Sequence, residues 1–146
     1  MIFSNLLEGS TYGAELTADY QPGTQWRVSG GYTYLDINLH LKPGSRDPIG
    51  GSLESRDWNH QVFLRGALTL PGNLELDGTL RRIGRLTNLQ VPAYTELDLR
   101  IGWRWSRALD LSLAGHNLLH ESHGEFGPPG RQLIERSVFA FITWQP

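Results

Sequence analysis

The residues best suited to chemistry lie close together near the C-terminus, where three histidines and two glutamates fall within ten positions. They are His116, His120, Glu121, His123 and Glu125. Imidazole and carboxylate groups at this density can ligate a transition metal. The spacing matches no fixed metal motif, so no metal site is predicted. A solvated loop that contacts a substrate is the favoured interpretation, with His120, His123 and Glu125 as candidate contacts. His116 follows the polar parity of the preceding strand, so it is expected to face the lumen and is a further candidate contact.

A second group of candidates alternates with apolar residues. Glu96, Asp98 and Arg100 occupy alternate positions, and with an arginine beside two carboxylates, charge pairing is favoured over acid–base catalysis. Arg100 is the fifth candidate substrate contact. Ser112 and His116 share one parity, but strand rise separates them by about 13 Å, too far for a catalytic hydrogen bond. No catalytic or cofactor-binding residue is predicted, and the protein is not expected to be an enzyme.

The elements that position these side chains show a two-residue alternation. In residues 26–34, Trp26, Val28, Tyr32 and Tyr34 share one parity with Gly30, and polar residues fill most of the other. Successive side chains of a strand point to opposite faces, so such a strand has one apolar and one polar wall. The pattern returns in 12–20 and 97–105. Runs of about ten residues suit a tilted strand that crosses a bilayer.

Seven strands are predicted, and their connections alternate between short and long. The strands lie near 11–20, 24–36, 58–70, 73–84, 94–105, 108–118 and 136–144, and the long connections are 37–57, 85–93 and 119–135. Short turns at one end and long loops at the other are typical of outer-membrane barrels. The predicted fold class is therefore all-β: an antiparallel transmembrane β-barrel segment of about seven strands, open because it is part of a larger barrel.

Composition narrows the class further. The chain has 146 residues, of which 39% are hydrophobic, and its net charge of −2 gives no electrostatic reason to expect nucleic acid as a partner. No apolar run is long enough for a membrane helix. The absence of cysteine excludes disulfides and thiolate metal sites. Residues 1–8 lack the features of a secretory signal, so we expect either a cytosolic protein or a piece of a longer chain.

Several segments in their order along the chain carry a family resemblance. They are Val91 to Trp103, Leu111 to Leu119, Glu125 to Gly127, Arg136 to Phe139 and Ile142 to Trp144, preceded by the hairpin-like stretch 12–35. Together they make the chain resemble the C-terminal barrel region of TonB-dependent outer-membrane receptors. One departure is that Gln145 and Pro146 follow Trp144, where such receptors usually end on an aromatic residue that the barrel assembly machinery reads.

The resemblance implies a function and a set of partners. Such receptors have a barrel of about 22 strands that encloses a plug, and they import scarce chelates, most often ferric siderophores. Residues 1–146 would be the C-terminal part of the barrel, and the plug that engages TonB is absent from this sequence. The implied partners are outer-membrane lipid, the TonB complex, the assembly machinery and a small-molecule metal chelate. The implied location is the bacterial outer membrane.

Two alternatives remain open at this point. The first is a small autonomous outer-membrane barrel, acting as a passive pore or adhesin, which would need an eighth strand that residues 1–8 are too short to supply. The second is a soluble β-sandwich carbohydrate-binding module, which has the same parity but no reason to place every long loop at one end.

Overall fold

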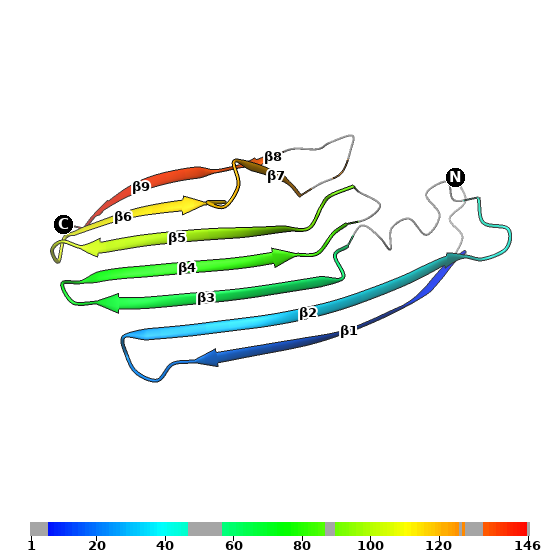
Figure 1. Cartoon of the computed structure of the whole chain (residues 1–146), viewed down its shortest axis with the longest axis horizontal. Coiled ribbons are helices and arrows are strands. Elements are labelled where there is room, and N and C mark those ends of the chain that lie inside the picture. The colour runs from blue at the N-terminus through cyan, green and yellow to red at the C-terminus, as the bar shows by residue number, and fades with distance from the viewer. Residues whose placement is uncertain (1–5, 47–56, 87–89, 126, 128–132, 146) are drawn as a thin grey trace.

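The computed structural model describes residues 6–46, 57–86, 90–125, 127 and 133–145, and this part of the chain is all-β. Seven strands form one antiparallel sheet in the order β1-β2-β3-β4-β5-β6-β9, and two form a small hairpin, β7-β8 (Figure 1). The strands are β1 (Leu7–Tyr20), β2 (Trp26–Leu41), β3 (His60–Leu70), β4 (Leu74–Ile83), β5 (Tyr94–Arg104), β6 (Leu109–His116), β7 (Ser122–Gly124), β8 (Leu133–Glu135) and β9 (Ser137–Trp144). The described residues contain no helix able to cross a membrane.

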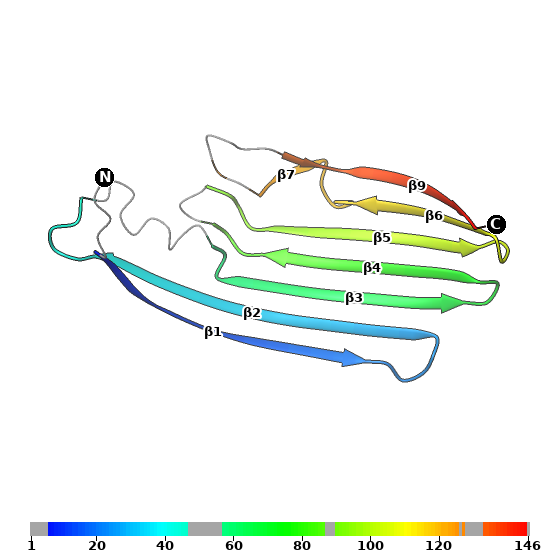
Figure 2. The ribbon, with the colours of Figure 1, turned by 180° about the vertical axis from the view of Figure 1, so that it is seen from behind.

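The sheet is a single open wall, and β1 and β9 are its two edges. The views from both sides show the seven strands side by side in one layer (Figure 2). The predicted segment of about seven antiparallel strands is therefore confirmed. The described strands do not form two packed sheets, so the β-sandwich alternative is wrong.

The two ends of the wall differ in their connections. Short turns join β1 to β2, β3 to β4 and β5 to β6 at one end, and the long connections lie at the other (Figure 1). The turn between β3 and β4 is tight because Gly72 and Asn73 adopt φ of 83° and 60°, which glycine and asparagine tolerate better than other residues. We call these the turn end and the loop end.

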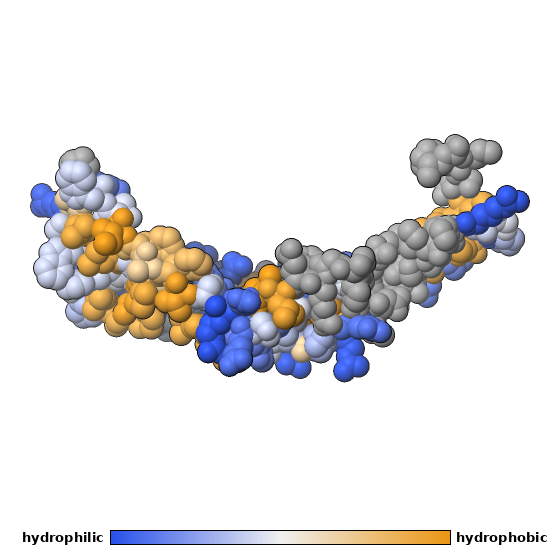
Figure 3. Space-filling model, turned by 90° about the horizontal axis from the view of Figure 1, so that it is seen from above, coloured by the Kyte–Doolittle hydropathy of each residue, from blue (hydrophilic) through white to orange (hydrophobic). Residues whose placement is uncertain are grey.

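The two faces of the wall differ in polarity. We call the face that carries Leu97, Leu99 and Ile101 the outer face, and the opposite face of the same strands the inner face. Register places Val28, Gly66, Gly78 and Leu99 in one row on the outer face, so the apolar parities of neighbouring strands align. Seen onto the β9 edge of the wall, apolar side chains gather toward the turn end, and strongly hydrophilic ones follow toward the loop end (Figure 3). The prediction of one apolar and one polar wall is confirmed in this region.

Aromatic side chains bound the apolar band of the outer face. Trp26 and Trp103 lie toward the turn end, where Trp103 packs edge to face on Trp105 with ring centroids 4.5 Å apart. Tyr34 and His60 are register partners nearer the loop end, with ring centroids 5.2 Å apart. Aromatic girdles of this kind border the apolar band of membrane barrels.

The β1–β2 hairpin is longer than predicted, because β1 begins at Leu7 and β2 extends to Leu41. Beyond Tyr34 the alternation changes phase. Asp36, Asn38 and His40 continue the outer parity, and the leucines and isoleucine between them point inward. A polar outer face no longer suits a lipid environment, so this extension rises above the apolar band. The strand ends predicted at 11 and 36 were wrong because the sequence pattern reverses there.

The long connection predicted at 119–135 also contains structure. Its ends form the hairpin β7–β8, in which Ser122 pairs with Glu135 and Gly124 with Leu133. Residue 126 and residues 128–132 of this connection lie outside the described residues, as do 47–56 of the connection predicted at 37–57. β6 ends at His116 instead of 118.

Candidate functional site

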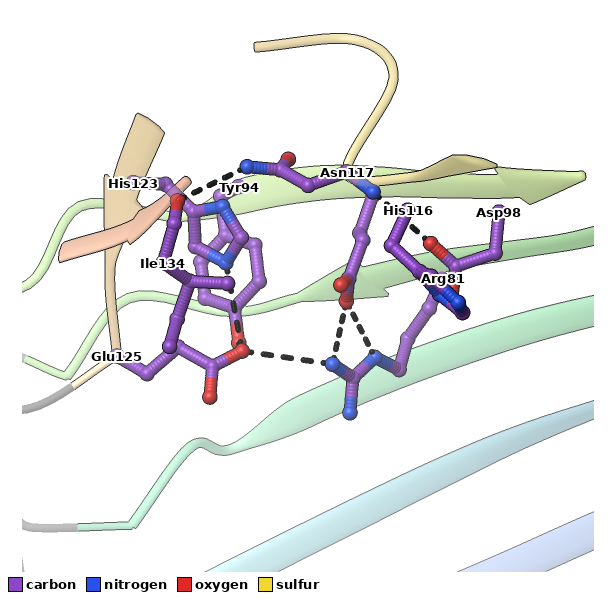
Figure 4. Close-up of polar contacts among 9 residues, drawn as sticks. Arg81, Tyr94, Asp98, His116, Asn117, His123, Glu125 and Ile134 are labelled. Atoms are coloured by element: carbon purple, nitrogen blue, oxygen red, sulfur yellow. Dashed lines mark hydrogen bonds and ion pairs between the residues drawn. The ribbon is translucent and has the colours of Figure 1, made fainter. Parts of the chain in front are cut away.

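A polar network lies on the inner face at the loop end, and Glu125 is its centre (Figure 4). The Tyr94 hydroxyl donates to Glu125 Oε1 over 3.0 Å, and Arg81 Nη2 lies 3.4 Å from the same oxygen. Arg81 Nε also donates to Glu96 Oε2 over 3.1 Å. His123 Nε2 lies 3.3 Å from Glu125 Oε1. One carboxylate oxygen therefore joins groups from β4, β5 and β7.

Sheet register explains how this network is assembled. Arg81 and Glu96 are direct partners across β4 and β5, and Ile83 pairs with Tyr94 one row nearer the loops. β6 pairs only with the second half of β5, from Leu99 to Arg104. The first half of β5, which begins at Tyr94, is therefore accessible to β7. His123 fills the space and stacks on Tyr94 with ring centroids 4.2 Å apart. The His123 side chain is only 7% exposed as a result.

Asn117 connects the hairpin to the sheet. Its φ of 52° turns the chain at the end of β6, and its backbone N–H donates to Asp98 Oδ1 over 3.0 Å. Its side-chain amide donates to the carbonyl of Ile134 in β8 over 3.0 Å. Asn117 is fully buried, and a buried hydrogen-bonded amide at this position fixes where the hairpin docks.

The five candidates from the sequence fall in three places. His123 and Glu125 belong to the network, and the His120 ring lies 6.5 Å from that of His123. His116 is separate: its Nδ1 lies 3.3 Å from Asp98 Oδ2 on the inner face. Arg100 lies nearer the turn end, and its Nη1 is 2.7 Å from Asp77 Oδ2. The structure therefore brings His120, His123 and Glu125 together and leaves His116 and Arg100 apart.

Three residues of the site were not singled out by sequence reasoning: Arg81, Tyr94 and Asn117. Arg81 had a detectable signal, because it shares the polar parity of the inner wall with Glu96. Tyr94 and Arg81 reach Glu125 across 31 and 44 positions of the chain. No local spacing reports contacts of that range.

The donor set has metal-binding potential, but an arginine already compensates part of its negative charge. Atoms of Glu96, His123 and Glu125 lie within 4.8 Å of one another, close enough to share a cation. The guanidinium of Arg81 contacts both carboxylates, so it already supplies positive charge to the pair that would ligate a metal ion. The arrangement acts as an ion-pair network that fixes β7 on the sheet.

Cross-strand ion pairs continue along the inner face. Arg104 Nε lies 3.3 Å from Asp110 Oδ1, and Arg27 Nη2 lies 2.9 Å from Asp19 Oδ1. Opposite charges on neighbouring strands neutralise one another. These cross-strand pairs thus leave little local excess of charge of either sign on the inner face.

These features together define the class of protein. A single antiparallel wall has a polar inner face, an apolar outer band bordered by aromatics, and alternating short and long connections, as expected for part of a transmembrane β-barrel. The chain belongs to the TonB dependent receptor-like β-barrel family, whose model matches residues 2–118.

Solved structures of receptors share this fold. One is the FpvAI–pyocin S2 complex, with 17% identity, a TM-score of 0.72 and coverage of 94% of this chain and 19% of that one. Another is P. aeruginosa FpvA bound to heterologous pyoverdines, with 18% identity, a TM-score of 0.58 and coverage of 90% and 19%. The chain therefore spans about a fifth of these receptors. No curated protein matches the sequence.

Proposed function

We propose that the protein carrying this chain is an outer-membrane receptor that imports a ferric siderophore or a similar scarce chelate, energised by TonB. Membership of the receptor family supports this role and argues against enzymatic activity. Structural relatives include FpvA in complex with iron-bound pyoverdine. In this proposal residues 1–146 form the C-terminal part of the barrel wall, and a plug outside this sequence contacts TonB.

The observation that carries the proposal is the construction of the inner face at the loop end. The hydroxyl of Tyr94 and the guanidinium of Arg81 are held in fixed positions by Glu125, and the His120 ring lies 6.5 Å from that of His123. Across the wall, the β1–β2 extension turns Ile37 and Leu39 to the same inner side. A chelate has polar metal-binding groups on an organic scaffold, so an inner face that carries fixed polar groups on β4 and β5 and apolar side chains on β2 suits its chemistry.

The remaining partners follow from the two faces and the edges. The apolar band of the outer face suits outer-membrane lipid. β1 and β9 would each need a neighbouring strand, because unpaired backbone groups are too costly in lipid. The barrel assembly machinery would act on β9, which ends at Trp144.

Uptake in iron-limited cells tests the proposal. Cells that express the receptor carrying this chain are given radioactive ferric pyoverdine, with and without TonB. We expect uptake with TonB, and surface binding alone without it. Uptake that persists at the same rate without TonB would contradict energised import.

A rim variant tests the role of the loop end. His120→Ala should weaken chelate binding by about fivefold, the value of one ordinary hydrogen bond. Arg107→Ala is the matched control, because Arg107 lies in the β5–β6 turn at the opposite end. Equal affinities of the two variants would place the binding surface elsewhere.

A further inference from the structure

Two phenylalanines lie on the inner face of β9, where the neighbouring strands are polar. Phe139 pairs in register with Ala114, and Phe141 pairs with Ser112. Residues directly opposite each other on antiparallel strands point to the same face, and Ala114 is also the partner of Arg100, which lies on the inner face. Both rings therefore point into the lumen that the barrel wall encloses, and they are 48% and 52% exposed.

The strands beside β9 offer no comparable surface on this face. In the described strands β4, β5 and β6, the inward positions below the polar network hold only charged, hydroxyl, imidazole, glycine or alanine residues. Phe63 on β3 also points inward, but it packs against Gly31, and the guanidinium of Arg65 lies 5.2 Å from its ring centroid. The ring of Phe63 is thus partly covered by this chain, whereas the two rings of β9 are open.

The two rings and an imidazole form one continuous aromatic surface. The ring centroids of Phe139 and Phe141 are 6.3 Å apart, with an angle of 33° between the ring planes. The ring of His116 meets that of Phe139 at a steep angle, with centroids 5.8 Å apart. We call Phe139, Phe141 and His116 the aromatic patch. Exposed apolar surface that is rimmed by polar residues marks an interaction site.

The aromatic patch is joined to the polar network at the loop end. Asp98 Oδ2 lies 3.3 Å from His116 Nδ1, and Asp98 Oδ1 accepts the backbone N–H of Asn117 over 3.0 Å (Figure 4). Asn117 in turn holds the β7–β8 hairpin through the carbonyl of Ile134. Because one carboxylate contacts both sides, the patch is the next surface of the wall below the proposed chelate surface.

Below the patch, toward the turn end, the inner face becomes charged. The row that follows Phe141 holds Arg104 and Asp110, whose side chains are paired, together with Thr143 of β9. These groups are satisfied by one another and by water, and they offer little apolar surface. On this side of the wall the patch is therefore an apolar step between two polar regions.

The chemistry of the patch fits an aromatic metal-chelating group. A catecholate-like ring has a flat apolar face and a polar edge that carries the iron-binding oxygens. The face can stack on the rings of Phe139 and Phe141, since aromatic rings favour offset and edge-to-face contacts with one another. The hydroxyl of Ser112, the register partner of Phe141, can donate to the polar edge. A purely ionic solute would make no use of the two phenylalanines.

We propose that the aromatic patch is a second binding position for the imported chelate, occupied by its aromatic chelating ring after the chelate leaves the loop end. The inference rests on the proposed function and adds the residues that the chelate contacts on its way along the wall. The patch speeds passage because it stabilises the ring at a level where the rest of the wall is polar.

Uptake by the full receptor in iron-limited cells tests this position. The probe is radioactive ferric pyoverdine, a chelate whose metal-binding groups include a fused aromatic ring. The double variant Phe139→Leu/Phe141→Leu keeps apolar side chains but removes both rings, so it should lower the TonB-dependent uptake rate at saturating chelate by about three- to tenfold. Phe139→Tyr/Phe141→Tyr keeps both rings and should transport at the wild-type rate. Ile142→Ala is the matched control, because Ile142 is 75% exposed on the outer face of the same strand, and it should also transport normally.

Surface binding in cells without TonB separates the outcomes. It measures the folded receptor at the surface, so the uptake rate is expressed per bound chelate, and its dissociation constant should be the same in all variants. A wild-type uptake rate in the leucine variant would overturn the proposal, and so would weaker surface binding by that variant, because the rings would then belong to the first position.

Entry of a large antibiotic into TonB-deficient cells that express the leucine variant would also overturn the proposal, because the patch would then be a contact that holds the plug. Failure of the proposed function gives a different result, since the wild-type receptor itself would then show no TonB-dependent uptake.

Discussion

Placing an arginine on the outer face tests the assignment of the two faces most directly. Leu99 is 40% exposed in the middle rows of the outer face and packs over Gly78. It lies four residues from Trp103, which corresponds to a climb of roughly 10 Å on a strand tilted by about 40°. Within an apolar band about 25 Å tall, this position is close to the midplane.

The expected cost of Leu99→Arg follows from that depth. An arginine at the midplane of a barrel exterior costs about 2–4 kcal/mol, which is roughly a 30- to 900-fold loss in the folding equilibrium constant. Leu99→Ala separates this charge penalty from the loss of the leucine side chain. Denaturant unfolding of the full receptor in lipid vesicles measures all variants on one scale.

Ser112→Arg is the matched control on the inner face. Ser112 lines a polar cavity of about 160 Å³ together with Glu75 and Asp110, so an arginine there has water and carboxylates as neighbours. We expect a cost below about 1 kcal/mol. Equal costs of Leu99→Arg and Ser112→Arg would refute the assignment of lipid to the outer face.

Three other predictions concern orientation and the loop end. Single cysteines are placed at Ser45 and at Arg107, and intact cells are treated with an impermeant thiol reagent. Only the cysteine at Ser45 should be labelled, and labelling at Arg107 alone would show that the orientation in the membrane is the reverse. Hydrogen bonds from Lys42 and His40 lower the pKa of Glu8. Its ionised side chain therefore stabilises the fold above the ordinary pKa range of glutamate, and this stabilisation is lost as the pH falls through the lowered pKa. The protection factors of amides at the loop end of β1, corrected for the intrinsic exchange rate, should therefore fall below about pH 4 in the wild-type protein, and Glu8→Gln should abolish that dependence. Asn117→Gly keeps the positive φ but removes the hydrogen bond to Ile134. The free energy of local opening, measured by hydrogen exchange in β7 and β8, should therefore fall by about 0.5–1.5 kcal/mol. The opening free energy of β3 should stay unchanged and is the internal control.

Sequence reasoning recovered the strands wherever one face is uniformly apolar. Residues 26–34 and 97–105 show this pattern; 26–34 lie in β2 and 97–104 in β5, with the predicted parity. β9 is less clear, because residues 138–142 are all apolar, and alternation does not separate its faces. Its pairing with β6, in which Leu113 faces Ala140, assigns them. Register is a property of two strands, so one strand's sequence does not determine it.

Of the candidate site, sequence reasoning identified only the residues that are close together along the chain. His120, His123 and Glu125 are near one another in sequence, and their clustering was visible. Arg81 and Tyr94 join them because β6 is short and β7 occupies the open side of β5. That depends on where β6 ends, and the positive φ of Asn117 sets that end. A local pattern therefore identified the residues that lie in the connection after β6 but not the strand residues that position them.

The reversal of phase after Tyr34 shows what alternation reports. Alternation by itself indicates only that a segment is a strand. Which of its two sides is apolar indicates whether each face contacts lipid or water. Below Tyr34 the outer side is apolar, as lipid requires. Above it the outer side carries Asp36 and His40, as water requires, and Ile37 turns to the inner side. The strand continues without interruption through the change, so a phase reversal within an unbroken strand marks the border of the apolar band and does not mark the end of the strand.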